Sequence, residues 1–264
     1  MEAALRRFAS EYASHRAAEG RGYRGRALFD LPYVSDGPLA RQWQVRARTF
    51  EAFMRRVLRP MAVRAGRTLT LLDLGAGNGW LSYRVAAEGH RAYALDIRND
   101  EVDGLGAATP FVRRYPDRIE CLVAPFDEVP LPPASVDIAL FNAAIHYATD
   151  LGTVLREAQR VVRPGGAIAI LDSPFYKSEA DGHAMVAEKR RDAGDRFGSR
   201  AAPLMSLPFI EFLTAERLAC AAPELRWRRH RVRYPLHYEL RSIRALLLGK
   251  RRPSRFDLWV AERP

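Results

Sequence analysis

The chain has 264 residues, of which 48% are hydrophobic and 28% are charged, as expected for a globular protein large enough for one sizeable core. No apolar run approaches the ~20 residues that a bilayer span needs, and the first residues have acids and no apolar core, so we expect no export signal, no membrane partner and a cytoplasmic location. The two cysteines, Cys121 and Cys220, form no paired motif, which argues against a disulfide framework or a Cys-based zinc site, and we expect no metal.

The formal net charge of +11 raises the question of an anionic partner. Only Lys177, Lys189 and Lys250 are lysines, so 42 basic residues minus these 3 leave 39 arginines. The arginines are scattered along the chain and form no focused basic stripe. We therefore do not expect a nucleic-acid partner.

The first 65 residues are predicted to be helical, in two pieces separated by a stretch with glycine and proline at 20–38. The second piece, 39–58, repeats apolar residues at three- and four-residue steps, which indicates one buried helical face: Trp43, Ala47, Phe50, Met54 and Val57. We expect residues 1–65 to form a helical extension that caps a domain at 66–264.

From Thr68 onward the pattern alternates between strands and helices, which indicates parallel strands joined by crossover helices. The predicted strands cover 68–74, 91–97, 119–125, 136–142 and 167–173, and the intervening helices include 79–89 and 151–166, the latter ending in a glycine stop signal. The tail adds a short helix at 240–249 between two closing strands, 225–232 and 256–262. We expect an α/β fold with a doubly wound, mostly parallel seven-stranded sheet, helices on both faces, and a substrate-lid insertion at 173–223.

Three glycines follow the first predicted strand, in the stretch LLDLGAGNGWLS at 71–82. Gly75, Gly77 and Gly79 permit a tight turn and let a ligand approach the backbone. A phosphate loop needs Gly-Lys-Ser/Thr, and no lysine is near. A dinucleotide site would continue GxGxxG, but Trp80 occupies the place of the third glycine and would obstruct close helix packing.

The stretch resembles the first motif of the class I (Rossmann-like) S-adenosylmethionine-dependent methyltransferases, an acidic residue followed by GxGxG. Further matches follow in order over residues 68–174: ALDI at 94–97, VDIALFNAAIHY at 136–147, and AQRVVRPGGAIAILDSP at 158–174. The order and spacing of these motifs make the resemblance more specific than the glycines alone. It implies an enzyme that uses S-adenosyl-L-methionine.

By this resemblance, Asp73 orients the turn and the methionyl ammonium, and Asp96 accepts hydrogen bonds from both ribose hydroxyls. Family members often have a Gly-Asp pair after the third strand, where this chain has Ala124 and Pro125, so Phe126 and Asp127 are taken as substitutes at the adenine. The full set of residues expected at the cofactor is Asp73, Gly75, Ala76, Gly77, Asn78, Gly79, Asp96, Ile97, Phe126, Asp127, Asn142 and Ala143.

Methyl transfer to a hydroxyl or amine also needs removal of a proton. His146, four residues after Asn142, is the candidate general base, with a structural histidine as the equal alternative. Residues outside the shared motifs are expected to bind the acceptor, and Arg46 could bind an acceptor carboxylate or phosphate. The acceptor candidates are Tyr33, Trp43, Arg46, Tyr147, Ser173 and Tyr176.

Three functions stay open at this point. The leading one is methyl transfer to an oxygen or nitrogen of a small molecule, which could be anionic. The basic balance keeps an RNA or protein methyltransferase as the alternative, although the fourth strand ends FNAA rather than in the Asn/Asp-Pro-Pro-aromatic motif of base N-methylation. The third is an S-adenosylmethionine-binding protein without catalytic activity.

Overall fold

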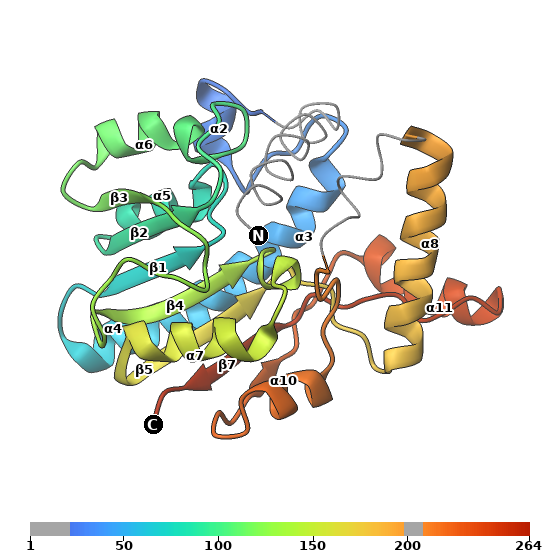
Figure 1. Ribbon diagram of the computed structural model, residues 1–264. Helices are drawn as coiled ribbons and strands as arrows, with labels where there is room; N and C mark the ends of the chain where they lie inside the picture. Colours follow the sequence, from blue (N-terminus) through green and yellow to red (C-terminus); the bar gives the residue numbers. More distant parts are fainter. Residues whose placement is uncertain (1–21, 198–207) are drawn as a thin grey trace.

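The computed structural model describes residues 22–197 and 208–264, and its centre is a seven-stranded sheet with the strand order β3-β2-β1-β4-β5-β7-β6 (Figure 1). Strands β1 to β5 pair in parallel, and β7 runs antiparallel to both of its neighbours. The expected mostly parallel doubly wound sheet is confirmed. The strands are β1 (Thr70–Leu74), β2 (Arg91–Asp96), β3 (Ile119–Val123), β4 (Val136–Asn142), β5 (Val162–Leu171), β6 (Arg228–His230) and β7 (Leu258–Glu262).

Alternate side chains of the central strands supply two separate apolar cores, one on each face of the sheet. Leu71 of β1 belongs to the core that includes Trp80 of α5 (Trp80–Ala87). Leu72, the next residue, belongs to the opposite core with Leu155 of α7 (Leu151–Val161). Because all seven residues of β4 are buried, this strand lies at the middle of both cores. Helices therefore cover both faces, as expected.

The N-terminal extension packs on the same face as α5. It contains α2 (Arg26–Asp30), α3 (Ala40–Phe53), a π-helical turn η1 (Met54–Leu58) and α4 (Arg59–Ala65). The face predicted from the three- and four-residue steps, from Trp43 to Val57, is buried. The first helical piece predicted from the sequence falls largely in residues 1–21, which lie outside the described residues.

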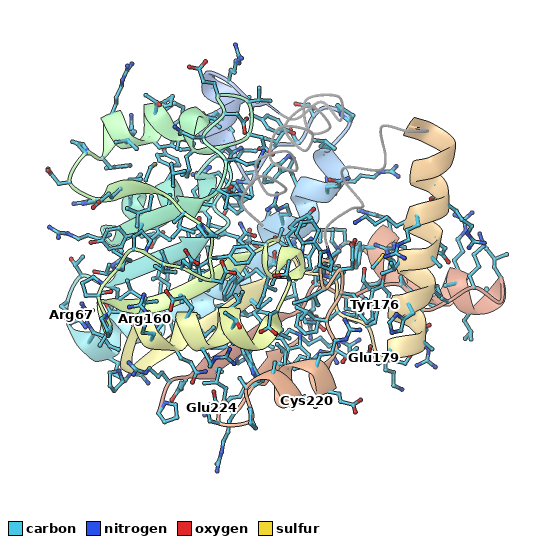
Figure 2. The ribbon with its side chains drawn as sticks, viewed as in Figure 1. Arg67, Arg160, Tyr176, Glu179, Cys220 and Glu224 are labelled. Carbon is cyan, nitrogen blue, oxygen red and sulfur yellow. The ribbon has the colours of Figure 1, made fainter. Side chains whose placement is uncertain are left out.

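The stretch predicted as an insertion contains α8 (Glu179–Phe197) and α10 (Ala215–Ala221), while 198–207 lie outside the described residues. Glu179 lies at the start of α8 (Figure 2). It accepts a hydrogen bond from Arg217 of α10, with Nη2 and Oε2 2.7 Å apart. The ion pair ties the two helices together beside the sheet. The tail then adds α11 (Leu236–Leu247) before β7 closes the sheet.

Several boundaries differ from those predicted from the sequence. Strand β5 starts at Val162 rather than 167, because Gly165 bonds through its N–H to the carbonyl of Arg263 and extends the pairing past the Pro-Gly-Gly turn. The tail helix begins at Leu236, directly after Pro235, instead of at 240. The short helices η2 (Leu105–Ala108), α6 (Thr109–Arg114) and η3 (Ile145–Tyr147) were not predicted. Each of these differences lies where packing, rather than local periodicity, decides the backbone.

Candidate active site

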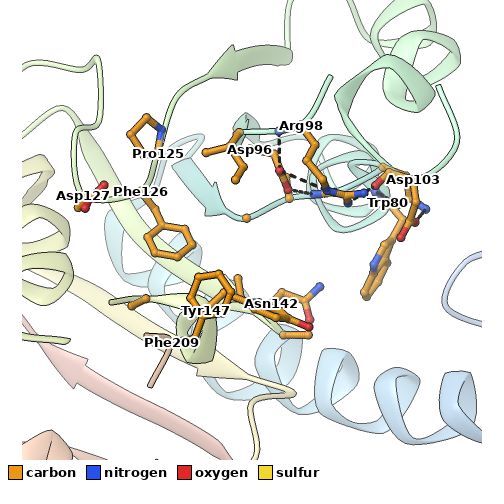
Figure 3. Close-up of a pocket in the computed structure, with 18 of the residues that line it drawn as sticks. Trp80, Asp96, Arg98, Asp103, Pro125, Phe126, Asp127, Asn142, Tyr147 and Phe209 are labelled. Carbon is orange, nitrogen blue, oxygen red and sulfur yellow. Dashed lines mark hydrogen bonds and ion pairs between the residues drawn. The ribbon is translucent and has the colours of Figure 1, made fainter. Parts of the chain in front are cut away.

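A cavity of about 170 Å³ opens where β1, β2 and β4 end (Figure 3). Parallel strands present their carboxyl ends at one edge of the sheet, and ligands of doubly wound folds bind there. Of the residues expected at the cofactor, all except Asp73 and Gly79 line this cavity: Gly75, Ala76, Gly77, Asn78, Asp96, Ile97, Phe126, Asp127, Asn142 and Ala143. The candidates Trp43, Arg46 and Tyr147 line it as well. The fold thus brings together residues that are up to about a hundred positions apart in the sequence.

The glycine turn forms the floor between β1 and α5. Gly75 has a φ of 76°, and a Cβ added there would lie 2.4 Å from Cβ of Ala144. The N–H groups of Gly75 and Ala76 both donate to the carbonyl of Leu95 at the end of β2. The turn therefore needs glycine for two reasons, a left-handed backbone and the close approach of the segment after β4.

Asp73 lies fully buried beneath this turn, at the penultimate position of β1. Its Oδ2 accepts a hydrogen bond from Oγ of Ser82 at 3.0 Å, whereas Oδ1 has no hydrogen-bond partner among the described residues. Burial raises the pKa of the carboxyl to about 7. An unsatisfied buried oxygen beside a cavity fits a cationic N–H donor, which would both satisfy the oxygen and stabilise the carboxylate.

Asp96 at the end of β2 is the second buried acid of the site. Its Oδ2 accepts from the N–H of Gly77 at 2.8 Å, and its Oδ1 accepts from the N–H of Arg98 at 2.9 Å (Figure 3). Burial raises the pKa of Asp96, and the nearby Arg98 opposes the rise. Both oxygens are oriented by backbone donors, and each retains acceptor capacity for a hydroxyl group. This arrangement suits a pair of vicinal hydroxyls.

The segment after β3 supplies the wall opposite the glycine turn. Pro125, Phe126 and Asp127 all line the cavity (Figure 3). The ring of Phe126 packs edge-on against Phe141 of β4, with 6.1 Å between centroids. Where the resembled family often has a Gly-Asp pair, this chain therefore presents a proline, an aromatic ring and an acid to the cavity.

Aromatic side chains surround the part of the cavity nearest α3. Trp43 and Trp80 pack edge-to-face at 5.7 Å, and the guanidinium of Arg46 lies over both rings, 4.8 Å and 5.6 Å from their centroids. On the other side, Tyr147 packs edge-on against Phe209 at 5.6 Å (Figure 3). Such a surface binds apolar or planar groups well, and the guanidinium of Arg46 gives it a positive charge.

His146 and three of the acceptor candidates are not among the residues that line the cavity. His146 lies behind Tyr147, with 4.3 Å between the ring centroids, and its Nδ1 is 3.2 Å from Oγ of the buried Ser173. Tyr33 is half exposed under the guanidinium of Arg84. Tyr176 is buried against Phe212 beside α8 (Figure 2). The structure thus separates Tyr33 and Tyr176 from the cavity.

The cavity also contains residues that sequence reasoning missed: Trp80, Arg98, Asp103, Pro125, Ala144, Ala148, Thr149 and Phe209. Trp80 was noted only as an obstacle to a dinucleotide, although its place beside the glycines was a usable signal. Arg98 and Asp103 belong to one hydrogen-bonded loop, in which Nη2 of Arg98 donates to the carbonyl of Asp103 at 2.7 Å. Phe209 reaches the cavity from the insertion, a contact that no local pattern indicates.

Two other kinds of site were sought in the described part of the chain. Among residues 22–197 and 208–264, no group of three or more His, Cys, Asp or Glu side chains is placed to hold a metal ion. Within the same residues, no helix has both the length and the apolar character to cross a bilayer.

Comparison with known proteins identifies the domain. Residues 72–170 match the family model described as "Methyltransferase domain". A malonyl-[acyl-carrier protein] O-methyltransferase of Erwinia pyrifoliae is 32% identical over 151 residues, covering 56% of this chain and 51% of the relative. The 27-O-demethylrifamycin SV methyltransferase of Amycolatopsis mediterranei is 33% identical over 135 residues, covering 51% and 48%. The chain spans about half the length of these two curated relatives.

Solved structures agree on the fold. The geranyl diphosphate C-methyltransferase of Streptomyces coelicolor superposes with a TM-score of 0.54, covering 91% of this chain and 88% of that protein, at 16% sequence identity. That protein was crystallised with S-adenosyl-L-homocysteine. Residues 72–170, which match the methyltransferase family model, are therefore a domain of the class I S-adenosylmethionine-dependent methyltransferases, and the sheet order agrees with that fold.

Proposed function

We propose that this protein transfers the methyl group of S-adenosylmethionine to an oxygen or nitrogen atom of a small-molecule acceptor. The observation that carries the proposal is the pair of buried acids at the strand ends, Asp73 with an unsatisfied oxygen and Asp96 with both oxygens oriented. One acid fits an ammonium and the other a ribose diol, and the glycine turn between them leaves room for the nucleoside.

In this proposal the cofactor extends along the cavity from Asp73 to the segment after β3. Bound S-adenosylmethionine supplies an electrophilic methyl group on a sulfonium. Asp73 binds the methionyl ammonium, Asp96 binds the ribose, and Ile97 and Phe126 contact the adenine. Asn142 and Ala143, at the end of β4, line the cavity between these groups.

The protein's own contribution to the reaction is alignment and exclusion of water, because a methyl displacement requires the attacking atom in line with the bond that breaks. Trp43, Tyr147 and Phe209 form the aromatic part of the cavity and would hold an apolar or planar acceptor. Trp43 comes from the extension and Phe209 from the insertion, whereas Tyr147 ends η3 in the sheet domain. These origins support the division into a cap at 1–65, a catalytic domain at 66–264 and a lid within 173–223.

His146 is the candidate for proton removal. His146 contacts Ser173 through Nδ1 and packs at a tilt against the ring of Tyr147, which lines the cavity where His146 does not. We propose that His146 either accepts the proton through a small rearrangement or fixes Tyr147 at the acceptor. Replacing His146 by Ala should lower turnover with unchanged cofactor affinity in the first case.

One of the curated relatives above is named an O-methyltransferase, and the name of the other refers to a 27-O-demethylated compound. Both names support oxygen as the acceptor atom. The relatives' acceptors, a malonyl group on a carrier protein and a rifamycin, differ widely in size. The relatives' names therefore do not indicate one acceptor for this chain. The aromatic lining of the cavity supports a small molecule of apolar or planar character.

Thermal melting tests the cofactor, and labelled methyl transfer tests the activity. S-adenosylmethionine and S-adenosylhomocysteine should raise the melting temperature, whereas NAD should not, since a ligand that binds only the native state stabilises it by mass action. Transfer of a labelled methyl group to any member of a panel of phenols, carboxylic acids and amines would support the enzyme. Stabilisation without transfer to any of them would favour the non-catalytic cofactor-binding protein, and no stabilisation at all would overturn the proposal.

A further inference from the structure

Arg46 occupies an unusual position for a helix residue of the extension. Its side chain, only 16% exposed, reaches from α3 into the cavity and lies over the faces of Trp43 and Trp80. The two indoles limit where the planar guanidinium can go. Arg46 is therefore a cation of the cavity that its neighbours fix in place.

A second layer of residues holds the guanidinium from behind. Nε of Arg46 is 3.4 Å from Oδ2 of Asp172, and Oδ1 of the same carboxylate accepts a hydrogen bond from Oγ1 of Thr49 at 2.6 Å. Asp172 directly follows β5, is buried, and has a left-handed backbone with a φ of 51°. Thr49 is fully buried and lies one turn after Arg46 on α3.

The guanidinium points toward the methionyl end of the proposed cofactor site. Its Nη2 is 3.5 Å from Oδ1 of Asn142, which ends β4. Arg46 also acts on Asp73, because its positive charge lowers the pKa of that buried carboxyl against the effect of burial. Asp73, with its unsatisfied oxygen, does not itself line the cavity, but it lies near enough to Arg46 for the charge of the guanidinium to act on it. The end of the cavity at Asn142 thus has a cation in it and a buried acid close by.

An acid and a cation at the same end of a cavity match an α-amino acid group, which carries an ammonium and a carboxylate on one carbon atom. An acceptor carboxylate, the partner expected for Arg46 from the sequence, has no need of the neighbouring acid. Arg46 contacts the carboxylate of Asp172 at 3.4 Å and the amide oxygen of Asn142 at 3.5 Å, so its guanidinium lies between the end of β4 and the residue that follows β5.

We propose that Arg46 binds the α-carboxylate of the cofactor's methionyl end, and that Thr49 and Asp172 are positioning residues that aim its guanidinium at that carboxylate. The inference rests on the proposed function, because it concerns the same cofactor. It gives the N-terminal extension a defined task, which is to complete the cofactor site that the sheet alone leaves open at one end.

Two related nucleosides test this assignment. S-adenosylhomocysteine carries the amino acid group, whereas 5′-methylthioadenosine has the same nucleoside and sulfur without it. In calorimetric titrations, Arg46→Gln should weaken binding of S-adenosylhomocysteine by about 10- to 100-fold, the range for hydrogen bonds to charged groups, and leave binding of 5′-methylthioadenosine within about twofold. Arg41→Gln, an exposed residue on the same helix, is the matched control and should change neither affinity.

Variants of Thr49 and Asp172 test the positioning residues. The measured quantity is the affinity for S-adenosylhomocysteine divided by the affinity for 5′-methylthioadenosine. Thr49→Val removes the hydroxyl that bonds to Asp172 and should lower this ratio, though by less than Arg46→Gln does. Thr49→Ser keeps the hydroxyl and should restore most of the ratio. Asp172→Asn keeps the shape but removes the charge behind Arg46, and should also lower the ratio.

The outcomes separate the two claims. If the wild-type protein binds neither nucleoside, the proposed function fails and the inference fails with it. If the wild type binds both and Arg46→Gln weakens both equally, Arg46 only supports packing, and the inference alone is overturned. If Arg46→Gln changes neither affinity, the guanidinium does not contact the cofactor, which also overturns the inference while the cofactor assignment stands.

Discussion

At the scale of single residues, burial raises the pKa of both Asp73 and Asp96, but the two acids differ in their hydrogen bonds. Asp96 receives two backbone N–H groups, whereas Asp73 receives one hydroxyl and keeps an unsatisfied oxygen. A carboxylate that accepts few hydrogen bonds in a dry site holds its proton more strongly. Asp73 is therefore the group whose charge depends on whether a cation is bound beside it.

This difference predicts a pH-dependent cofactor affinity. The pKa of Asp73 in the folded, unliganded protein is about 7, so the carboxyl is mostly neutral below that pH and charged above it. Because the ammonium of S-adenosylhomocysteine binds the charged form, its affinity should fall by up to about tenfold for each pH unit below 7 and level off above it. Calorimetry between about pH 5.5 and 8.5 measures the profile.

The control is Asp73→Asn, which cannot ionise and should give weaker binding with a flat pH profile. The free energy of unfolding of the unliganded protein should change with pH in the opposite direction to the affinity. A carboxyl with a raised folded pKa contributes more stability when protonated, so this residue lowers the free energy of unfolding of the unliganded protein as pH rises through about 7. An affinity for S-adenosylhomocysteine that is constant across this range would contradict the assigned role of Asp73.

Residues close in sequence to the glycine motif could be assigned to the cavity before the structure was known. Gly75, Gly77 and Asp96 lie there because the ends of adjacent parallel strands meet at one edge. Phe209 and Arg98 could not be assigned, since their places depend on how an insertion and a loop pack. Tyr33 and Tyr176, both expected at the acceptor, do not line the cavity. Tyr33 packs against Arg84 and Tyr176 against Phe212.

At the scale of elements, the turn between β1 and α5 predicts a contrast between two glycines. Gly75 and Gly66 both have left-handed backbones, with φ of 76° and 62°. An added Cβ at Gly75 meets Ala144 at 2.4 Å, whereas at Gly66 nothing lies within 4 Å. Gly66→Ala should therefore cost only the backbone strain, about 1 kcal/mol in the free energy of unfolding, and leave cofactor binding intact.

Gly75→Ala adds a steric clash to the same strain, because Ala144 must move. It should cost clearly more than Gly66→Ala and weaken binding of S-adenosylhomocysteine, since Ala144 also lines the cavity. Urea unfolding and calorimetry of the two variants compare the effects. Equal costs in stability with equal affinities would mean that the turn accommodates a side chain, against the account given for the glycines.

The strands and longer helices were predictable because burial imposes a regular period on the sequence. The centre of β4, residues 138–141, is a continuous apolar run because both faces of the strand are covered, and α7 has one clear apolar face. The π-helical turn at Met54–Leu58 was not predictable, since one extra residue in a turn leaves the three- and four-residue steps nearly unchanged. The early start of β5 depends on the pairing of Val162 with Val136 of β4 and on the bond from Gly165 to Arg263, contacts that no local pattern indicates.

At the scale of the whole molecule, the net charge of +11 predicts weak and nonspecific attraction to nucleic acid. Many of the arginines are engaged in local ion pairs, such as Arg59 with Glu88 and Arg229 with Asp257. Binding of a short single-stranded RNA should therefore be lost between about 50 and 200 mM salt and show no sequence preference. Tight binding that survives this salt, measured by fluorescence anisotropy, would instead favour an RNA methyltransferase.

The fold as a whole brings the cap, the sheet and the insertion to one cavity, and the sequence motifs alone define only the sheet's part of it. The doubly wound sheet was predictable from the alternation of elements. The contributions of α3 and of the segment at Phe209 were not, because they depend on long-range packing onto the strand ends. The part of the cavity proposed to hold the acceptor, to which these two segments contribute, is accordingly the part that needed a structure.

The account depends most on Asp96 as the acid that binds the ribose. Calorimetric titration of Asp96→Ala with S-adenosylhomocysteine tests this role most directly. The control is Asp117→Ala, at an exposed carboxylate just before β3, and the melting temperature of each variant checks that it is folded. We predict that Asp96→Ala weakens binding by at least about 100-fold, because two charge-assisted hydrogen bonds are lost, while Asp117→Ala binds like the wild type. A folded Asp96→Ala protein with unchanged affinity would contradict the cofactor site proposed for this chain.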